Sequence, residues 1–320
     1  MTSKNSTFRR AVLGTAVALG TGLAAGGAGA ETFRLMTGPQ GGSWYPLGGA
    51  IQNIIQKAIP GSSVQVQPGA GIINAIGVEN GKAELGFGNS VSTVDAVHGR
   101  DPFKAKAENL CQIASLYFQY FQVVAPKNMG IDSVDDLKGK AIAVQPRGNT
   151  AEQMSRDLLE TYGLSYDDMS KVNFVSYTDA VSLMQDGHIQ GFTLITTIPA
   201  SSIMDLATSR DISVLNVPDE RLEKLRSKNE GYDKRTIAAG TYPKQEDDVQ
   251  TFGTWTHLFG SCKMPEQTAY SITKALAENL DDLSGVVSAL KGLDVKEMAT
   301  DVGVPFHPGA EKYYREQNVL

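Results

Sequence analysis

Cysteine and histidine are scarce in this 320-residue chain, and neither occurs in a pattern that indicates chemistry. Its two cysteines, Cys111 and Cys262, form no C-x-x-C pair, and its four histidines show no spacing typical of metal ligands. The chain has no H-E-x-x-H, G-x-S-x-G or Walker-A motif, and the run Gly69–Asn74 lacks the last glycine of the dinucleotide-binding fingerprint. We therefore expect no metal site, no cofactor and no catalytic residue.

The two cysteines leave one question open. In an oxidising compartment Cys111 and Cys262 could form a single disulfide, and two buried free thiols are the alternative. A disulfide requires both residues to lie in the same lobe.

Long apolar runs are also absent beyond the first 30 residues, and a membrane span needs about 20 such residues. The N-terminus has three basic residues, an apolar run over 11–23 and then Ala28-Gly29-Ala30. This is the layout of a secretory signal peptide over 1–30, cleaved before Glu31. A membrane anchor is the alternative, but the run is short and rich in Gly, Ala and Thr. We expect export to the periplasm, by the Sec route or, given Arg9-Arg10, by twin-arginine export.

Basic residues do not dominate the chain, which carries 29 Lys and Arg against 35 Asp and Glu. Without the three basic residues of the signal segment, 26 remain, for a formal charge of −9. Nucleic-acid binding needs clustered Lys and Arg for phosphate contacts, and no basic stripe with interleaved aromatics is present. We expect no nucleic-acid partner.

Short apolar strands alternate with amphipathic helices over most of the chain. One β-α-β-α-β succession covers 33–87, and a second unit of strands and helices covers 121–217. This alternation predicts an α/β protein with mostly parallel sheets flanked by helices. The last quarter shows only helix patterns, which begin at Pro265 and Pro308 and which we expect to pack on the first unit.

The size of the chain predicts two lobes. The 290 residues after the signal segment exceed the usual size of a single core. We predict that lobe 1 comprises 31–122 and 245–320 and that lobe 2 comprises 123–244.

Ligands of open α/β sheets bind beyond the carboxyl ends of the strands, and the first loop in such a position is Thr37–Tyr45. Its three glycines precede Ser43, Trp44 and Tyr45. Glycines let a ligand approach backbone N–H groups, a helix N-terminus favours a carboxylate, and the aromatic side chains combine apolar surface with a polar tip. A plain tight turn is the alternative.

Asn89 and Ser90 follow the next predicted strand and could bond a ligand. They could equally cap the helix that follows, which is the simpler interpretation. Thr196 and Thr197 form another polar strand end, for which solvated surface side chains are the alternative.

The segment Arg147, Gly148, Asn149 and Thr150 again connects a strand to a helix. Arg147 could hold a carboxylate through two parallel hydrogen bonds, and a solvated surface arginine is the alternative. Asn149 with Glu152 three residues later matches a capping box.

Taken in order, these loops resemble the TAXI family of solute receptors for TRAP transporters. The matching segments are TGPQGGSWYPLGGAI at 37–51, ELGFGNSVSTVDAVHG at 84–99, IASLYFQYFQVV at 113–124, SVDDLKGKAIAV at 133–144, AAGTYPKQED at 238–247 and HPGAEKYYRE at 307–316. The likeness spans essentially the whole chain after the signal segment. Its most specific parts are the last segment and the Gly-Gly-x-aromatic-Tyr-Pro loop.

The resemblance implies the type II periplasmic-binding-protein fold, with two α/β lobes joined at a hinge and a ligand in a central cleft. It also implies membrane partner subunits that use an ion gradient rather than ATP. The implied ligand is a small organic acid or amino acid, such as a glutamate-like compound or a 2-oxo dicarboxylate. By position, the ligand-binding residues that it implies are Ser43, Trp44, Tyr45, Asn89, Ser90, Arg147, Gly148, Asn149, Thr150, Thr196 and Thr197.

The chain departs from the family pattern at these loops. Trp44 stands where the family more often has Tyr, and the Asn89-Ser90 pair and the Thr196-Thr197 strand end are also unusual for it. The Arg147–Thr150 segment is bulkier and more cationic than the usual small-residue run, which suggests a more acidic ligand than a neutral amino acid. The alternatives to a TRAP receptor are a binding protein of an ABC importer or a sensor kinase, and an enzyme on the same scaffold.

Overall fold

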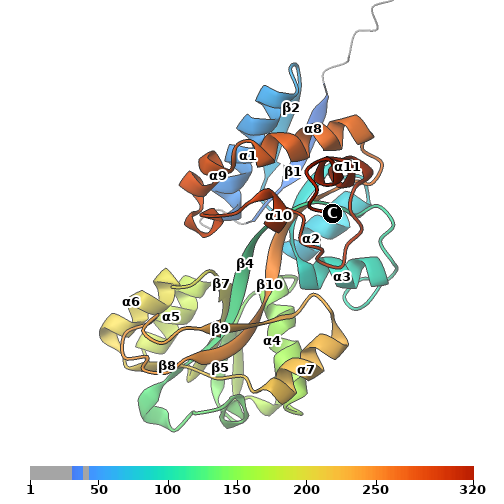
Figure 1. The fold of residues 1–320 in the computed structure, drawn as a ribbon. Helices are drawn as coiled ribbons and strands as arrows, with labels where there is room; N and C mark the ends of the chain where they lie inside the picture. Colours follow the sequence, from blue (N-terminus) through green and yellow to red (C-terminus); the bar gives the residue numbers. More distant parts are fainter. Residues whose placement is uncertain (1–30, 39–42) are drawn as a thin grey trace, which may run out of the picture.

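The computed structural model describes residues 31–38 and 43–320. The predicted signal peptide over 1–30 and part of the Thr37–Tyr45 loop therefore lie outside the described residues. The chain forms two bodies joined by two long strands, β4 (Cys111–Pro126) and β10 (Val249–Gly260) (Figure 1). The first body holds β1–β3 and the helices of both ends of the chain, and the second body holds β5–β9. This mixed α/β arrangement confirms the predicted fold class.

In the first body, strands and helices alternate, as predicted. They are β1 (Thr32–Met36), α1 (Trp44–Ala58), β2 (Ser63–Gln67), α2 (Gly71–Glu79), β3 (Leu85–Asn89) and α3 (Ser90–His98). β1 lies between β2 and β3 and pairs with both in parallel. α1 forms because its apolar residues, Leu47, Ile51 and Ile55 among them, recur at helical spacing and bury one face.

The second body repeats this pattern around β5, which pairs in parallel with β6 and β7. Its elements are β5 (Ala141–Val144), α4 (Thr150–Thr161), β6 (Lys171–Phe174), α5 (Tyr177–Gln185), β7 (Gly191–Thr196), α6 (Ser201–Ser209), β8 (Ile212–Val214), α7 (Asp219–Lys228) and β9 (Asp233–Ile237). Short 3-10 helices cover Lys127–Met129, Val134–Leu137 and Tyr166–Asp168 in this body, and Ser288–Leu290 in the first body.

β4 and β10 link the two bodies into one continuous sheet. β10 pairs with β3 in the first body and with β9 in the second, and β4 pairs with β10, β7 and β8. Every pair that includes β4 or β10 is antiparallel, whereas the other pairs are parallel. The sheet is thus less uniformly parallel than the sequence predicts, because the chain crosses between the bodies twice in opposite directions.

The prediction of helices alone in the last quarter is wrong, since β10 lies there. This strand is buried along almost its whole length, so its side chains show no alternation of apolar and polar residues. Glycines and buried threonines, such as Gly253, Thr254 and Thr256, interrupt its apolar pattern further. The predicted lobe boundaries at 122/123 and 244/245 fall inside β4 and just before β10, and this division stays a prediction.

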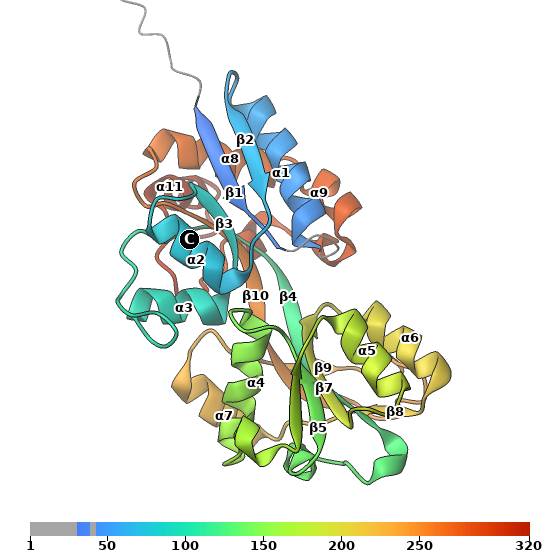
Figure 2. The same cartoon turned by 180° about the vertical axis from the view of Figure 1, so that it is seen from behind.

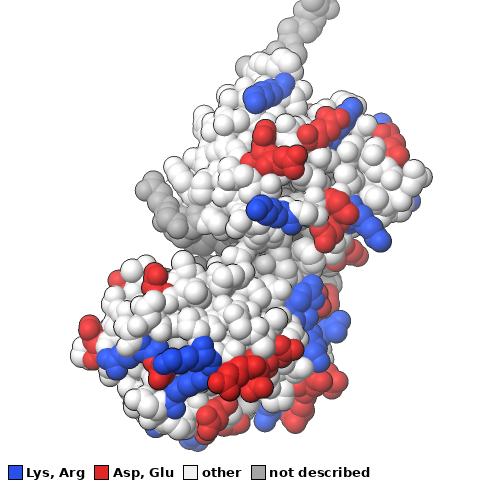
Figure 3. All heavy atoms as spheres, turned by 60° about the vertical axis from the view of Figure 1, so that its left-hand side comes forward, with Lys and Arg blue, Asp and Glu red and all other residues white. Residues whose placement is uncertain are grey.

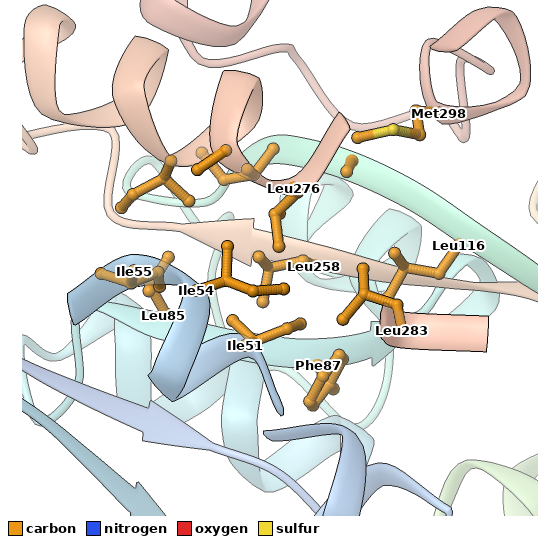
Figure 4. Close-up of a cluster of buried hydrophobic side chains, with 14 of the residues drawn as sticks. Ile51, Ile54, Ile55, Leu85, Phe87, Leu116, Leu258, Leu276, Leu283 and Met298 are labelled. Carbon is orange, nitrogen blue, oxygen red and sulfur yellow. The ribbon is translucent and has the colours of Figure 1, made fainter. Parts of the chain in front are cut away.

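The C-terminal helices pack on the first body, as predicted. They are α8 (Glu266–Ala277), α9 (Leu280–Val286), α10 (Val295–Met298) and α11 (Pro308–Glu316). Figure 4 shows Ile51 and Ile54 of α1 beside Leu276 of α8 and Leu283 of α9. Each such side chain stabilises the fold by roughly 1.5–3 kcal/mol on burial.

Cys111 and Cys262 form a disulfide, which settles the question that the sequence left open. Cys111 begins β4 and Cys262 follows β10, so both lie at the first-body end of this antiparallel pair. No helix within 31–38 and 43–320 has the length and apolar composition of a membrane span. Acidic and basic side chains are interspersed on the face shown in Figure 3, and the surface narrows between the two bodies.

Candidate functional site

The carboxyl ends of the parallel strands of both bodies lie towards the junction between the bodies (Figure 2). On β3, Leu85 and Phe87 face the core beneath α1, whereas added Cβ atoms at Gly86 and Gly88 would meet residues of α2, α3 and β10. Helices therefore leave the strand ends towards opposite faces of the sheet. Such a switch point is where open α/β sheets bind ligands.

Three helices begin at this junction: α2 and α3 from the first body and α4 from the second. The Thr150 hydroxyl at the start of α4 donates a hydrogen bond to Ser92 Oγ of α3, at 3.2 Å. A Cβ on Gly71, the first residue of α2, would lie 2.6 Å from Thr150 Oγ1 and 3.4 Å from Asn89 Oδ1. Only glycine fits there without a shift of Thr150, so the bodies meet at these helix starts.

The first turns of α2 and α3 have no side-chain cap, although Val91 N of α3 donates to Thr254 Oγ1 at 3.2 Å. Neither Ala70 nor Asn89, the residues that precede these helices, accepts a hydrogen bond from the helix with its side chain. The Asn89 amide instead donates to Gln119 Oε1 of β4, at 2.9 Å. Free N–H groups and the helix dipoles together favour an anion at such a place.

Asn149 caps α4, as the capping-box pattern predicted. Its side-chain oxygen accepts from Ala151 N at 2.9 Å, and Gly148 before it has a φ of +86°, which favours glycine. The reciprocal bond of a capping box is not formed, because the Glu152 carboxylate accepts from Tyr166 and Arg156 instead.

The loop before α1 contributes Ser43, whose hydroxyl bonds to the Tyr117 hydroxyl of β4 at 3.0 Å. Burial raises the pKa of Tyr117, so this hydroxyl keeps its proton and remains a donor. Trp44 is buried and its ring stacks on Phe87 at 5.7 Å. The tryptophan thus supports the loop from the core, and Tyr45 is partly exposed on the first turn of α1.

Two buried glutamines that the sequence analysis missed belong to this region. Gln119 receives the Asn89 bond, and Gln145 directly follows β5 with 5% of its surface exposed. The Nε2 group of Gln145 has no acceptor among the described residues. A polar residue immediately after a buried strand was the signal that could have identified Gln145.

The hydrogen bonds of Asn74 give a structural role to the run Gly69–Asn74, which resembles an incomplete dinucleotide-binding fingerprint. Its amide nitrogen donates to Thr37 O at 2.7 Å and Phe87 O at 2.9 Å, and its oxygen accepts from Ala70 N at 3.1 Å. A Cβ on Gly69 would lie 2.0 Å from that oxygen. The run therefore ties the ends of β1 and β3 to the start of α2.

Ser90 and Arg147 have contacts within the protein, whereas Thr196 and Thr197 lie at the end of β7. The Ser90 hydroxyl is occupied by Gly231 O, at 2.8 Å, and by Thr254 Oγ1, at 2.6 Å. The exposed Arg147 guanidinium lies 4.5 Å above the ring of Phe174, and no ion pair of this arginine is formed within the described residues. Its predicted grip on a ligand carboxylate stays a prediction. Thr196 ends β7 and Thr197 follows it, and both are partly exposed.

The buried side chains that the structure does bring together here are neutral. Asn89, Ser92, Gln119 and Thr150 carry hydroxyls or amides, and positive potential comes from the helix starts. Within the described residues, no group of three or more His, Cys, Asp and Glu side chains could hold a metal ion. The arrangement suits hydrogen bonding to a small polar anion.

Solved structures with a similar fold are solute-binding proteins. They include PhnD1 from Prochlorococcus marinus in complex with methylphosphonate, at 12% identity, a TM-score of 0.55 and coverage of 91% of this chain and 99% of that chain. A TctC solute binding protein from Polaromonas has 17% identity, a TM-score of 0.53 and the same coverage. A structure from a study of glutathione import by GshT and the cystine ABC importer TcyBC of Streptococcus mutans has 16% identity, a TM-score of 0.50 and coverage of 85% and 98%.

These likenesses confirm the two-lobed binding-protein fold. The sequence itself matches the family model described as NMT1-like over residues 35–317, which is most of the chain. This chain therefore belongs to the NMT1-like family.

Proposed function

We propose that the protein is an extracytoplasmic receptor that captures a small organic acid or amino acid between its two bodies and delivers it to a TRAP transporter. The observation that carries the proposal is the convergence of α2, α3 and α4 at Gly71, Asn89, Ser92 and Thr150. A carboxylate at these helix starts would accept hydrogen bonds from both bodies and so favour the closed arrangement.

The chemistry of the site supports a small carboxylate as the ligand class. The N–H groups of α2 and α3, with the hydroxyls and amides around them, donate hydrogen bonds without a buried cation. Gln145 adds a buried donor that lacks a protein acceptor in the described residues. Since a buried donor without an acceptor costs about 1–3 kcal/mol, a bound acceptor would stabilise the protein.

The TRAP partnership rests on the resemblance of the loops to the TAXI family, and export rests on the predicted signal peptide. The competing partner is an ABC importer, since the Streptococcus mutans structure of similar fold comes from a study of ABC import. Co-purification with the membrane subunits encoded beside this protein would distinguish the two. The absence of enzymatic activity is likewise part of the proposal, and turnover of the bound ligand would contradict it.

The experiment that tests the site begins with native mass spectrometry of freshly purified protein, followed by calorimetric titration with the acid identified. We expect Thr150→Ala to weaken binding about tenfold, the effect of losing one hydrogen bond of about 1.4 kcal/mol.

Thr273→Ala is the matched control, because Thr273 is also buried but donates to Ala269 O within α8. Equal affinities of the Thr150→Ala protein and the wild type would contradict the site, and the absence of binding to any amino acid or organic acid would contradict the proposed function.

A further inference from the structure

The two bodies are held together on one side by α3 and the loop that follows it. Outside the strands β4 and β10, the hydrogen bonds and ion pairs between the bodies in the described part of the chain all involve residues 89–101 of the first body. Their partners lie in α4 and in residues 229–231. None joins α1 or α9 to α5 or α6, the helices drawn on the opposite side in Figure 1.

Asn229 lies at the centre of this contact and is almost completely buried. Its amide nitrogen donates to Val91 O at 3.0 Å and to Asp95 Oδ1 at 2.7 Å. Its oxygen accepts from Gly231 N at 2.7 Å, and Gly231 O in turn accepts from the Ser90 hydroxyl at 2.8 Å. The second body thus holds the first half of α3 through the amide nitrogen of Asn229 and through Gly231 O.

The contact is apolar as well as polar. Val91 of α3 lies in the hydrophobic core of the second body, together with Tyr232 and Phe252. A Cβ on Gly231 would lie only 2.7 Å from the backbone carbonyl carbon of Ser90, so the two backbones are in direct contact. Separation would expose this core and leave several buried polar groups without partners, each at a cost of about 1–3 kcal/mol.

We infer that α3 and residues 229–232 form a fixed joint between the bodies, additional to β4 and β10. The bodies then open only on the side of α1, α9, α5 and α6, and Asn229 is a positioning residue. It holds the first half of α3 against residues 229–232. The inference rests on the proposed capture by closure, since it specifies the direction in which the bodies open.

Spin-label distances measured on ligand-free full-length protein test the joint directly. One label pair, Lys104→Cys with Lys224→Cys, spans the α3 joint from exposed positions, and a second pair, Asp205→Cys with Asp282→Cys, spans the opposite side. The native cysteines stay in their disulfide. We expect a single narrow distance for the joint pair and a broader or two-peaked distribution for the other pair. A joint-pair distribution as broad as that of the other pair would overturn the inference.

Asn229→Ala should broaden the joint-pair distribution, because it removes all three bonds of the amide. Asn109→Ala is the control: Asn109 is also buried, donates to Val78 O and accepts from Ser261, but acts within the first body. It should leave the joint-pair distribution unchanged. If Asn229→Ala does not fold, Asn229→Asp keeps the acceptor for Gly231 N, removes the donors and should have the same effect.

An unchanged joint-pair distribution in the Asn229 variants contradicts the joint. Narrow distributions for both pairs in the wild type contradict capture by closure instead, and the response to Asn229→Ala still decides on the joint. The two proposals can therefore fail separately.

Discussion

At the junction of α2, α3 and α4, a glycine and a threonine hydroxyl set how closely the bodies approach. Gly71 lies against Thr150 Oγ1, which itself bonds to Ser92. An added methyl group at position 71 would force the hydroxyl to rotate and break that bond. The sequence analysis selected Thr150 from its place after a strand, but nothing in the sequence relates it to Gly71, since that contact arises only when the two bodies meet.

We expect Gly71→Ala to lower the free energy of unfolding by about 1 kcal/mol, the typical value of a lost hydrogen bond. In a Thr150→Ala background the same change should cost nothing, because the clashing hydroxyl is gone. Urea denaturation of the two single variants and the double variant measures this coupling. Gly49→Ala serves as control, since nothing lies within 4 Å of an added Cβ there, and it should raise stability by about 0.4–1 kcal/mol. Additive effects of the Gly71 and Thr150 changes would contradict the contact.

A second single-residue effect concerns Asp95, the carboxylate at the α3 joint. Burial raises its pKa to about 6, and the neighbouring Asp157 adds to the shift, whereas bonds from Gln153 and Asn229 and the nearby Arg100 oppose it. The folded protein thus binds this proton more tightly than the unfolded chain, in which the pKa is near 3.8. The contribution of the Asp95 proton to the free energy of unfolding is therefore fully present below about pH 4. It is lost as the pH rises through 6.

Asp95→Asn should therefore stabilise the protein at pH 7.5, by up to about 3 kcal/mol, and have little effect at pH 4. The Gln153 side chain can turn to accept from the new amide, because its oxygen has no donor among the described residues. Denaturation at a series of pH values checks this difference. A stability gain that does not depend on pH would show that the charge of Asp95 is not its cause.

At the scale of helices and strands, the prediction succeeded where a local pattern dictates the element. α1 and the strands β1, β2, β3 and β5 have regular apolar spacing within short segments, and their order indicates the α/β class. β10 was missed because its partners β3 and β4 lie far away in the sequence and because a strand buried on both faces shows no alternation. β9 was missed because its short, mostly polar sequence shows no apolar pattern. The role of α3 was missed for the same reason as β10, since Asn229 reaches it from a distant part of the chain.

The residues of the candidate site likewise divide into those with a local signal in the sequence and those without one. Ser43, Asn89 and Thr150 follow strand ends and were found from that position alone. Gln119 and Asn74 lie inside elements, where a polar residue gives no local signal of its bonding partners. The position of the Arg147 guanidinium above the ring of Phe174 could not be predicted either, because Phe174 lies on another strand, and the ligand contact of Arg147 stays a prediction.

For the molecule as a whole, the disulfide joins two positions that are 151 residues apart in the sequence and that enclose the entire second body. Closing so long a loop removes much conformational freedom from the unfolded chain. We expect the double variant Cys111→Ser, Cys262→Ser to be less stable by about 2–5 kcal/mol. Calorimetric melting of the oxidised wild type and the variant measures this loss. A reductant should lower the melting temperature of the wild type and leave that of the variant unchanged; equal melting temperatures would contradict the prediction.

The same layout has a consequence for the order in which the protein can fold. The chain leaves the first body through β4 and returns through β10, so residues 127–248 are complete before the last helices are synthesised. The apolar face of α1, by contrast, is covered by α8 and α9, and α11 packs in turn on α8. A nascent chain can therefore assemble its middle portion early, whereas its N-terminal portion lacks the helices that cover α1 until residues 266–316 arrive.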